Sequence, residues 1–283
     1  MTSFSDLPIL RFGVVADPQY AARAPHLGMN RHYARSLARL SEAIEVFNGE
    51  DLSFVITLGD IIDRDFKSFD DILPIYDSLK HQNFFLLGNH DFSVVADRLA
   101  DVASRVGLAS PYYSFIRQGW RFIVVNGNEV STFAPPLGHP YREIAAQRLA
   151  ELRGAGAINA QDWNAMPSDE QFAWLSEQIK DAGAAGERVI VMNHYPVYPP
   201  NEHDSWDRER IVRLLTAHDN VAAYLSGHNH AGNFGTLDGC HFLNFKGMVD
   251  TETENTFAIV EIWADRIEVR GFGREDSRTL KLC

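Results

Sequence analysis

Residues 54–63 read FVITLGDIID, a short apolar run that ends in a glycine and two carboxylates. A run of this length, rich in β-branched and aromatic residues and followed by glycine, is typical of a buried strand that ends in a turn. The segments LRFGVVADPQ at 10–19 and NFFLLGNHD at 83–91 follow the same plan. We therefore predict strands over 10–16, 54–58 and 83–87.

Two helices are predicted between these strands. Apolar residues recur with helical spacing over 31–48, with Asn30 as the N-cap, and again over 69–80. Strand, helix and strand in repeated order favour parallel pairing with right-handed crossovers. The second half of the chain adds a hairpin over 112–116 and 121–126, a helix capped by Ser168, a helix over 206–217, strands over 188–192 and 221–225, and antiparallel strands from 233 onward.

These elements predict an α/β fold, a βα-sandwich of four layers with two mixed β-sheets inside and helices outside. No repeat or linker divides the 283 residues, so a single domain over 1–283 is expected. The segment 127–167, rich in Pro, Gly and Ala, is its insertion, with one helical piece around 142–153. It forms either a lid or an extension of the outer helices.

Composition limits the classes of partner. The formal charge is −12 and the sequence pI about 5.3, so the surface repels nucleic acids and anionic membranes. No apolar stretch approaches the roughly 20 residues that span a bilayer, and MTSFSDLPIL at the N-terminus does not resemble a signal peptide. The only cysteines, Cys240 and Cys283, predict no disulfide framework. A cytoplasmic protein is expected, and its charge remains compatible with a small anionic substrate if metal ions reverse it locally.

Five predicted strands end in residue types that bind metals. In α/β sheets such residues gather beyond the carboxyl ends of the strands, where all five ends can face one crevice. Each cluster alone has an ordinary explanation, because Asp and Gly commonly form turns and a lone His is commonly structural. Their joint occurrence favours one shared site, made of DPQ at 17–19, GDIID at 59–63, GNHD at 88–91, NHYP at 193–196 and GHNH at 227–230.

This series resembles the motif set of the calcineurin-like metallophosphoesterases, written D-x-H, GD, GNH, H and GHxH. The resemblance runs from Asp17 to His230 and implies the metallophosphoesterase fold with a two-metal site. It implies that the first metal is held by Asp17, Gln19, Asp60 and His230, and the second by Asp60, Asn89, His194 and His228.

The chemistry of these residue types agrees with that assignment. A carboxylate has two oxygens, so Asp60 suits a bridging position, and His228 and His230 point to the same side of an extended segment. Two cations roughly 4 Å apart can hold substrate oxygens and lower the pKa of a bridging water. Gln19 departs from the motif, which has His there. Its neutral amide oxygen shifts the expected preference to Mn²⁺, with Mg²⁺ also possible.

Gln19 also makes the resemblance more specific, because it points to one family among these phosphoesterases. D-x-Q followed by Tyr20 and NRHY at 30–33 is similar to the manganese-dependent ADP-ribose/CDP-alcohol diphosphatases. The similarity continues through Phe172, Trp174 and Leu175, HYPVYP at 194–199, Trp206, KGMVDT at 246–251, Phe257 and RGFGR at 270–274.

The narrower resemblance implies hydrolysis of ADP-ribose, CDP-choline and similar CDP-alcohols to a nucleoside monophosphate and a phosphorylated alcohol. The expected reaction is in-line attack of a metal-bridging hydroxide on phosphorus. Resemblance makes His90 a catalytic residue, which donates a proton to the leaving oxygen. Asp63 either orients His90 or a metal-bound water or forms an ordinary turn, and Asp91 is expected to be structural.

Candidates for contact with the substrate are less specific. A nucleoside needs an apolar slot with a few polar groups, and Arg31 is placed to meet a phosphate. Any single aromatic residue is more commonly part of the core. The candidates are Tyr20, Arg31, Tyr195, Trp206 and Phe257.

Two other functions use the same motifs. A cyclic-nucleotide or general phosphodiesterase would carry the same metal ligands, and turnover of ADP-ribose against 2′,3′-cyclic AMP separates the two. A non-catalytic scaffold of this fold would bind metals without hydrolysis. His90 and a competent donor at every ligand position favour an enzyme.

Overall fold

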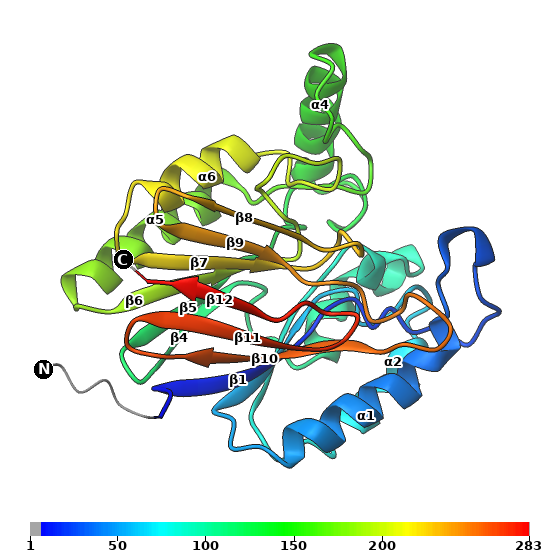
Figure 1. The fold of residues 1–283 in the computed structure, drawn as a ribbon. Helices are drawn as coiled ribbons and strands as arrows, with labels where there is room; N and C mark the ends of the chain where they lie inside the picture. The colour runs from blue at the N-terminus through cyan, green and yellow to red at the C-terminus, as the bar shows by residue number, and fades with distance from the viewer. Residues whose placement is uncertain (1–6, 283) are drawn as a thin grey trace, which may run out of the picture.

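A computed structural model describes residues 7–282, so the expectations about the first six residues and Cys283 lie outside the described residues. Two six-stranded sheets pack face to face, with helices on their outer faces (Figure 1). The first sheet has the order β12-β11-β10-β1-β2-β3. Its strands are β1 (Leu10–Val15), β2 (Phe54–Leu58), β3 (Asn83–Leu86), β10 (Thr256–Ile262), β11 (Arg266–Gly273) and β12 (Arg278–Lys281).

The second sheet has the order β4-β5-β6-β7-β9-β8, so each sheet combines parallel and antiparallel pairs. Its members are β4 (Tyr113–Arg117), β5 (Trp120–Val124), β6 (Arg188–Met192), β7 (Val221–Ser226), β8 (Asn233–Leu237) and β9 (Cys240–Asn244). The predicted hairpin is present, and its turn uses Gln118 and Gly119 at positive φ. The predicted α/β sandwich is therefore confirmed.

The helices complete four layers. Helices α1 (Ser36–Asn48) and α2 (Ser68–Tyr76) cover the first sheet through a cluster that includes Leu40, Phe47 and Phe69. Helices α5 (Asp169–Ala184) and α6 (Arg208–Thr216) cover the second through Leu175 and Ile211. The remaining α-helices are α3 (Val102–Arg105) and α4 (Pro140–Gly154). In the described residues no helix combines the length and the apolar character that crossing a bilayer requires.

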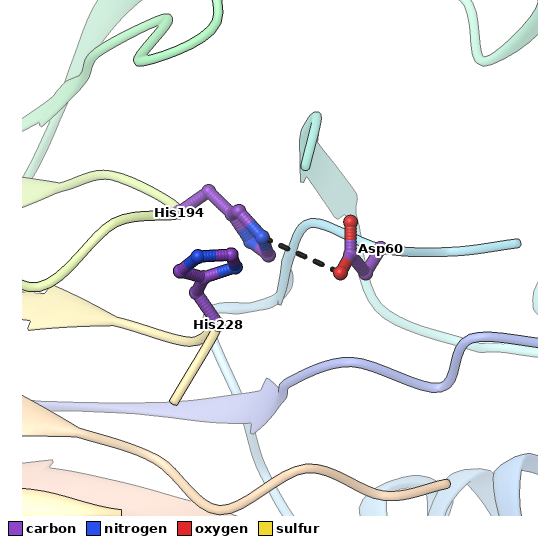
Figure 2. A group of neighbouring side chains, drawn as sticks. All are labelled: Asp60, His194 and His228. Atoms are coloured by element: carbon purple, nitrogen blue, oxygen red, sulfur yellow. Dashed lines mark ion pairs between the residues drawn. The ribbon is translucent and has the colours of Figure 1, made fainter. Parts of the chain in front are cut away.

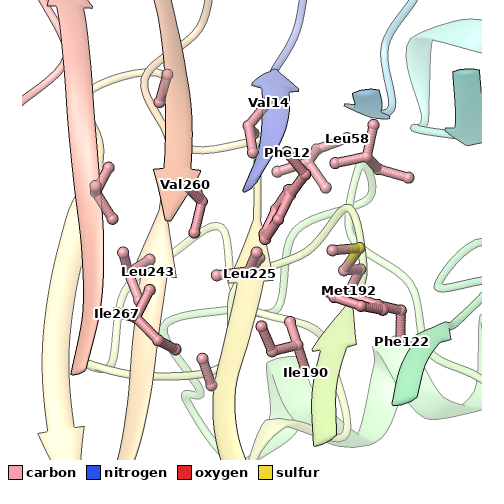
Figure 3. Packing of buried hydrophobic residues seen from close by; sticks show 14 of the residues in the cluster. Phe12, Val14, Leu58, Phe122, Ile190, Met192, Leu225, Leu243, Val260 and Ile267 are labelled. Carbon is pink, nitrogen blue, oxygen red and sulfur yellow. The ribbon is translucent and has the colours of Figure 1, made fainter. Parts of the chain in front are cut away.

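The main core lies between the two sheets (Figure 3). Side chains alternate across each strand, so Phe12 and Phe54 point from the first sheet toward Phe122 of the second. The rings of Phe12 and Phe54 stack with centroids 4.8 Å apart, and Phe122 meets Phe12 edge-on at 5.6 Å. This apolar layer fixes how the two sheets face each other, and with them the strand ends that carry the predicted ligands.

The helix predicted over 31–48 begins later, at Ser36, and Asn30 is not its N-cap. Residue 30 has a φ of 53° and ends a short 3₁₀ helix, Leu27–Met29. Arg31 and His32 instead pair with the 249–250 segment, and the His32 amide donates to Val249 O at 2.8 Å. This pairing keeps both residues outside the helix.

Two further helix boundaries differ from prediction. Helix α2 ends at Tyr76 because the Asn48 side chain binds the backbone of Ser78 and Lys80, at 2.9 and 2.7 Å, and holds them in a turn. Helix α6 begins at Arg208 because the Trp206 amide is bonded to Ala165 O at 3.0 Å, in the insertion.

The segment 127–167, which the sequence predicts to be an insertion, has two parts. Helix α4 projects away from both sheets (Figure 1). The chain then returns toward the second sheet, where the amide of Met166 bonds to Val130 O at 3.2 Å and Trp206 is buried under α4. The returning part brings residues of the insertion next to the strand ends of the second sheet.

Candidate metal centre

All seven predicted ligands lie at the carboxyl ends of parallel strands. The first sheet supplies the oxygen donors from the turns after β1, β2 and β3, and the second supplies the imidazoles from the turns after β6 and β7. Six of the seven side chains are at most 9% exposed, and Asn89 is half-buried. The first group is Asp17, Gln19, Asp60 and Asn89, and the second is His194, His228 and His230.

The turns that carry the ligands have unusual backbone geometry. Asp17, Gln19, Asp60 and His228 have φ values of 48°, 46°, 50° and 67°, in the left-handed region that L-residues seldom occupy. Gly88 is required by close approach, because a Cβ there would lie 2.1 Å from Asp60 Oδ1. The left-handed conformation of these four residues turns their side chains toward the other ligands, at the cost of backbone strain.

Two groups of candidate ligands share one residue. Asp60, His194 and His228 form the first group, and Asp17, Asp60 and His230 form the second, with ligand atoms within 4.8 Å of one another in each. Figure 2 shows Asp60 facing the two imidazoles, and its Oδ2 lies 3.4 Å from His194 Nε2. A carboxylate between two groups can hold two cations, one on each oxygen.

The two amides lie beside these groups. Asn89 Oδ1 is 3.2 Å from His194 Nε2. Gln19 is oriented by its own amide hydrogen, since Nε2 donates to Asp63 Oδ1 at 3.1 Å. Gln19 Oε1 is buried without a hydrogen-bond partner among the described residues, and the contact of Asp60 Oδ2 is the long ion pair with His194. Buried oxygens are seldom left unpaired, so Gln19 Oε1 in particular fits a cation better than it fits the protein alone.

Hydrogen bonds set the tautomers of two imidazoles. His194 Nδ1 lies 2.8 Å from Leu58 O, and His230 Nδ1 lies 2.9 Å from Asp250 Oδ1. A carbonyl or carboxylate oxygen can only accept, so Nδ1 carries the proton in both rings and Nε2 of the neutral ring has a free lone pair. His230 Nε2 lies 3.7 Å from Asp17 Oδ1, at the second group. This arrangement is usual for metal-binding histidines.

His228 is oriented by a residue of the insertion. Its Nε2 lies 2.9 Å from Asn164 Oδ1, so Nε2 donates and Nδ1 keeps the lone pair. The Asn164 amide orientation is fixed, because Nδ2 donates to Asn159 O and Glu202 O at 3.1 and 2.7 Å. The insertion thus takes part in the site through a fully buried asparagine.

Replacing Asn164 by alanine should weaken the binding of one of two Mn²⁺ ions by about 10–100-fold, because His228 loses the partner that fixes its ring. Calorimetric titration of the metal-free protein with Mn²⁺ measures both affinities. Asn220→Ala is the matched control, since Asn220 donates to Ile179 O at 3.0 Å, in a separate turn of the fold. Unchanged Mn²⁺ affinity in the Asn164 variant would show that His228 needs no such support.

Charges at the site balance one another without a metal. Burial raises the pKa of Asp17 to about 6. Burial also opposes ionisation of Asp60, but attraction to His194 and then to His90 outweighs it and holds the pKa of Asp60 below its usual value. Burial lowers the pKa of His194, but the charge of Asp60 outweighs this effect and raises the pKa of His194 to about 9. A divalent cation would take the place of these protons, so metal binding releases protons.

Asp63 lies beside the ligands and contacts several of their neighbours, and its side chain is only 1% exposed. Its Oδ1 accepts from Gln19 and lies 3.2 Å from His90 Nδ1, which is also 3.1 Å from the backbone oxygen of Asp63. Its Oδ2 accepts from Arg23 Nη1 at 3.1 Å and from Arg64 Nε at 2.7 Å. Asp63 thus holds one candidate ligand and the candidate catalytic histidine in fixed orientations.

Asp91 has a different environment. Its Oδ1 accepts from the amides of Ile61 and Ile62 at 2.8 and 3.1 Å, and its Oδ2 accepts from the Gly88 amide at 2.8 Å. The carboxylate therefore ties the turn after β2 to the turn after β3. This is a structural role.

The ligands open into a cavity of about 410 Å³. Arg31, Tyr33 and His90 line it together with residues that the sequence did not single out, among them Arg23, Trp163 and His203. Trp163 lies in the insertion next to Asn164 and is 40% exposed. Neither residue belongs to a periodic pattern, so only the tertiary structure reveals them.

Of the five proposed substrate contacts, Arg31 lines this cavity and the other four do not. Tyr20 and Phe257 are packed between the first sheet and its helices, and Trp206 is packed under α4. Tyr195 is fully buried, with its ring 5.1 Å from His194 and 4.8 Å from His228, where it packs against both rings. These four aromatic residues belong to the core because burial of their large apolar surface is favourable.

Known proteins resemble the chain over most of its length. The model of the calcineurin-like phosphoesterase family matches residues 10–232. A manganese-dependent ADP-ribose/CDP-alcohol diphosphatase from Arabidopsis thaliana is 27% identical, with 98% of each chain covered. One of the same name from Xenopus tropicalis is also 27% identical, over 96% of this chain and 94% of the relative. The crystal structure of a dimetal phosphatase from Danio rerio superposes with a TM-score of 0.87 at 23% identity, covering 98% of this chain and 100% of that one.

Proposed function

The chain belongs to the calcineurin-like phosphoesterase family, and from this premise we propose that it hydrolyses the phosphoanhydride bond of nucleoside diphosphate-linked compounds. ADP-ribose and CDP-choline represent the substrate class, and the products are a nucleoside monophosphate and a phosphorylated alcohol. The observation that carries the proposal is the pair of ligand groups that share Asp60, with Gln19 Oε1 free beside them. Relatives named for this activity align with nearly the whole chain.

The residues present fit two divalent cations. Asp17, Gln19, Asp60 and His230 would hold one, and Asp60, Asn89, His194 and His228 the other. Such ions supply Lewis acidity toward phosphoryl oxygens when bound. We favour Mn²⁺, because Gln19 adds an oxygen donor where nitrogen would suit zinc, and because the relatives are named manganese-dependent.

The chain's own residues would orient the substrate and move a proton. His90 lines the cavity, and Asp63 fixes its ring through Nδ1, so Nε2 is the atom left to meet the leaving oxygen. We assign His90 the role of proton donor at Nε2 and Asp63 the role of positioning residue. Arg31 would contact a phosphate from the cavity wall.

The proposal is tested by offering ADP-ribose, CDP-choline, 2′,3′-cyclic AMP and p-nitrophenyl phosphate to the purified protein with Mn²⁺ or Mg²⁺. Release of AMP and CMP from the two diphosphates is expected, with turnover highest in Mn²⁺. Turnover confined to the cyclic nucleotide or the aryl phosphate would contradict the substrate class while leaving the metal site in place.

Replacing Gln19 by histidine should change the order of metal preference. A nitrogen donor favours zinc-like ions over Mn²⁺, and histidine also lacks the amide hydrogen that Gln19 gives to Asp63. We expect turnover in Mn²⁺ to fall about tenfold and the ratio of Mn²⁺ to Zn²⁺ affinity to fall as well. Gln82→His, at an exposed position, is the control. An unchanged metal ratio would show that Gln19 does not reach the metal.

We also propose a cytoplasmic location. Cys240 is a buried free thiol, which fits a reducing compartment, and the charge of −12 suits a protein that acts on small nucleotides rather than on nucleic acid.

A further inference from the structure

A second cavity, of about 750 Å³, adjoins the one that contains the candidate ligands. Arg23 and Arg64 line both cavities, so their guanidinium groups lie at the junction. The second cavity is also lined by Ala22, Lys67 and Ser68, from the loop after β1 and the start of α2. A ligand longer than one phosphate can therefore extend from the first cavity, past the two arginines, into the second.

The junction brings two guanidinium groups to one carboxylate. Arg23 Nη1 and Arg64 Nε both bind Asp63 Oδ2, at 3.1 and 2.7 Å. Two cations thus face one carboxylate, and that carboxylate also receives hydrogen bonds from Gln19 and His90. Asp65 and Asp71 also line the second cavity, so the case for an anion rests on the N–H groups that the two arginines do not use toward Asp63.

The two guanidinium groups are held in place and still accessible. Asp63 uses one nitrogen of each group, and the side chains remain 35% and 50% exposed. The Arg23 guanidinium also lies over the ring of Tyr33, 4.8 Å from its centroid, which limits its motion. Arginine presents five N–H donors in a planar fork that matches phosphate oxygens. The remaining N–H groups of the pair are suited to hold a phosphate.

Building on the proposed function, we propose that Arg23 and Arg64 bind the second phosphate of a diphosphate substrate, the one that leaves with the alcohol. The first phosphate then lies at the shared Asp60, and the alcohol extends into the second cavity. Polar side chains of Asp65, Lys67, Ser68 and Asp71 line that cavity, which fits an alcohol that carries hydroxyl groups, such as ribose. The enzyme would thus select substrates with two linked phosphates over simple phosphodiesters.

The first test compares Arg23→Gln with wild type on two substrates. We expect kcat/KM for ADP-ribose to fall about 10–100-fold, and kcat/KM for bis(p-nitrophenyl) phosphate, which has one phosphate, to change less than about threefold. Glutamine keeps a donor for Asp63, so His90 and Gln19 stay oriented. Arg35→Gln is the matched control, because Arg35 pairs with exposed Glu252 at 3.3 Å and lines neither cavity.

Equilibrium binding supplies a readout that does not depend on turnover. Wild type should bind α,β-methylene-ADP, which cannot be cleaved between its phosphates, about tenfold or more tightly than AMP in calorimetry. Arg23→Gln should lose that advantage. Equal losses on the one-phosphate and two-phosphate ligands would show that Arg23 acts through Asp63 and would overturn the inference, whereas a wild type that cleaves no diphosphate would overturn the proposed function.

The place of the alcohol is tested by filling the second cavity. Ala22 is exposed and lines only that cavity, so a large side chain there should not disturb the core. Ala22→Trp should raise KM for ADP-ribose about tenfold by steric exclusion. It should leave the affinity for α,β-methylene-ADP unchanged, because that analogue has no alcohol attached to its second phosphate. An unchanged KM for ADP-ribose would mean that the alcohol lies elsewhere.

Discussion

An Asp60→Asn protein should hydrolyse ADP-ribose about 10³-fold more slowly than wild type or worse, and should bind fewer Mn²⁺ ions. Asp60 belongs to both ligand groups, and its Oδ2 is buried without a hydrogen-bond partner among the described residues. Asparagine offers one oxygen and no charge, so it cannot hold two cations. Replacement of Asp60 should therefore weaken the binding of both metals, whereas replacement of a ligand that binds one metal should weaken the binding of that metal.

The measurement combines steady-state hydrolysis with Mn²⁺ stoichiometry from calorimetry. A thermal melt adds a second readout, because Mn²⁺ at 100 times its dissociation constant should stabilise wild type by about 2.7 kcal/mol and the variant by less. Asp70→Asn is the control, since Asp70 is exposed and pairs only with Arg105 at 2.8 Å among the described ion pairs. A variant that binds two Mn²⁺ with wild-type affinity would refute the bridging role of Asp60.

A His90→Gln protein should lose about 10²–10⁴-fold in kcat on ADP-ribose while its Mn²⁺ affinities stay close to wild type. The ring of His90 is fixed by Asp63 and lines the cavity. Among the hydrogen bonds of the described residues, only its backbone amide touches a candidate ligand, donating to Asp60 Oδ1 at 2.8 Å. Glutamine keeps that amide and the approximate size of the side chain but cannot donate a proton to the leaving oxygen.

The choice of substrate separates a proton donor from a structural residue. p-Nitrophenolate leaves without protonation, so hydrolysis of a p-nitrophenyl ester should fall much less in the His90 variant than hydrolysis of ADP-ribose. His81→Gln is the control, at a half-buried histidine that meets Phe47 O at 2.9 Å on the far side of the first sheet. Equal losses on both substrates, or a loss of Mn²⁺, would assign His90 to metal binding or to local structure.

The sequence predicted the two sheets and the place of the seven ligand types because both depend on local patterns. Apolar runs such as 54–58 form buried strands, and a glycine with a carboxylate after them marks the strand end. Parallel pairing of β1 with β2 and of β2 with β3 then brings those ends together. These steps need only the order of residues along the chain.

Features that depend on contacts distant in the sequence escaped prediction. Asn30 has the chemistry of an N-cap, but the pairing of Arg31 with Asp250, about 220 residues away, delays the helix. The bond from His228 to Asn164 crosses from a strand end to the insertion, and no periodicity marks Asn164. Tyr195 and Trp206 have the chemistry to bind a nucleoside, yet the sheets and the insertion bury them.

Four of the ligands sit on residues in the left-handed region, and each such residue that is not glycine costs about 1 kcal/mol or more in the folded chain. That cost is tolerated only while the ligands are useful. In a lineage that lost the reaction, selection for metal binding would no longer oppose glycine at the positions of Gln19 and His228, and relief of the backbone strain would offset part of the cost of the lost side-chain contacts. Drift at these turns would thus record loss of catalysis before the sheets themselves had changed.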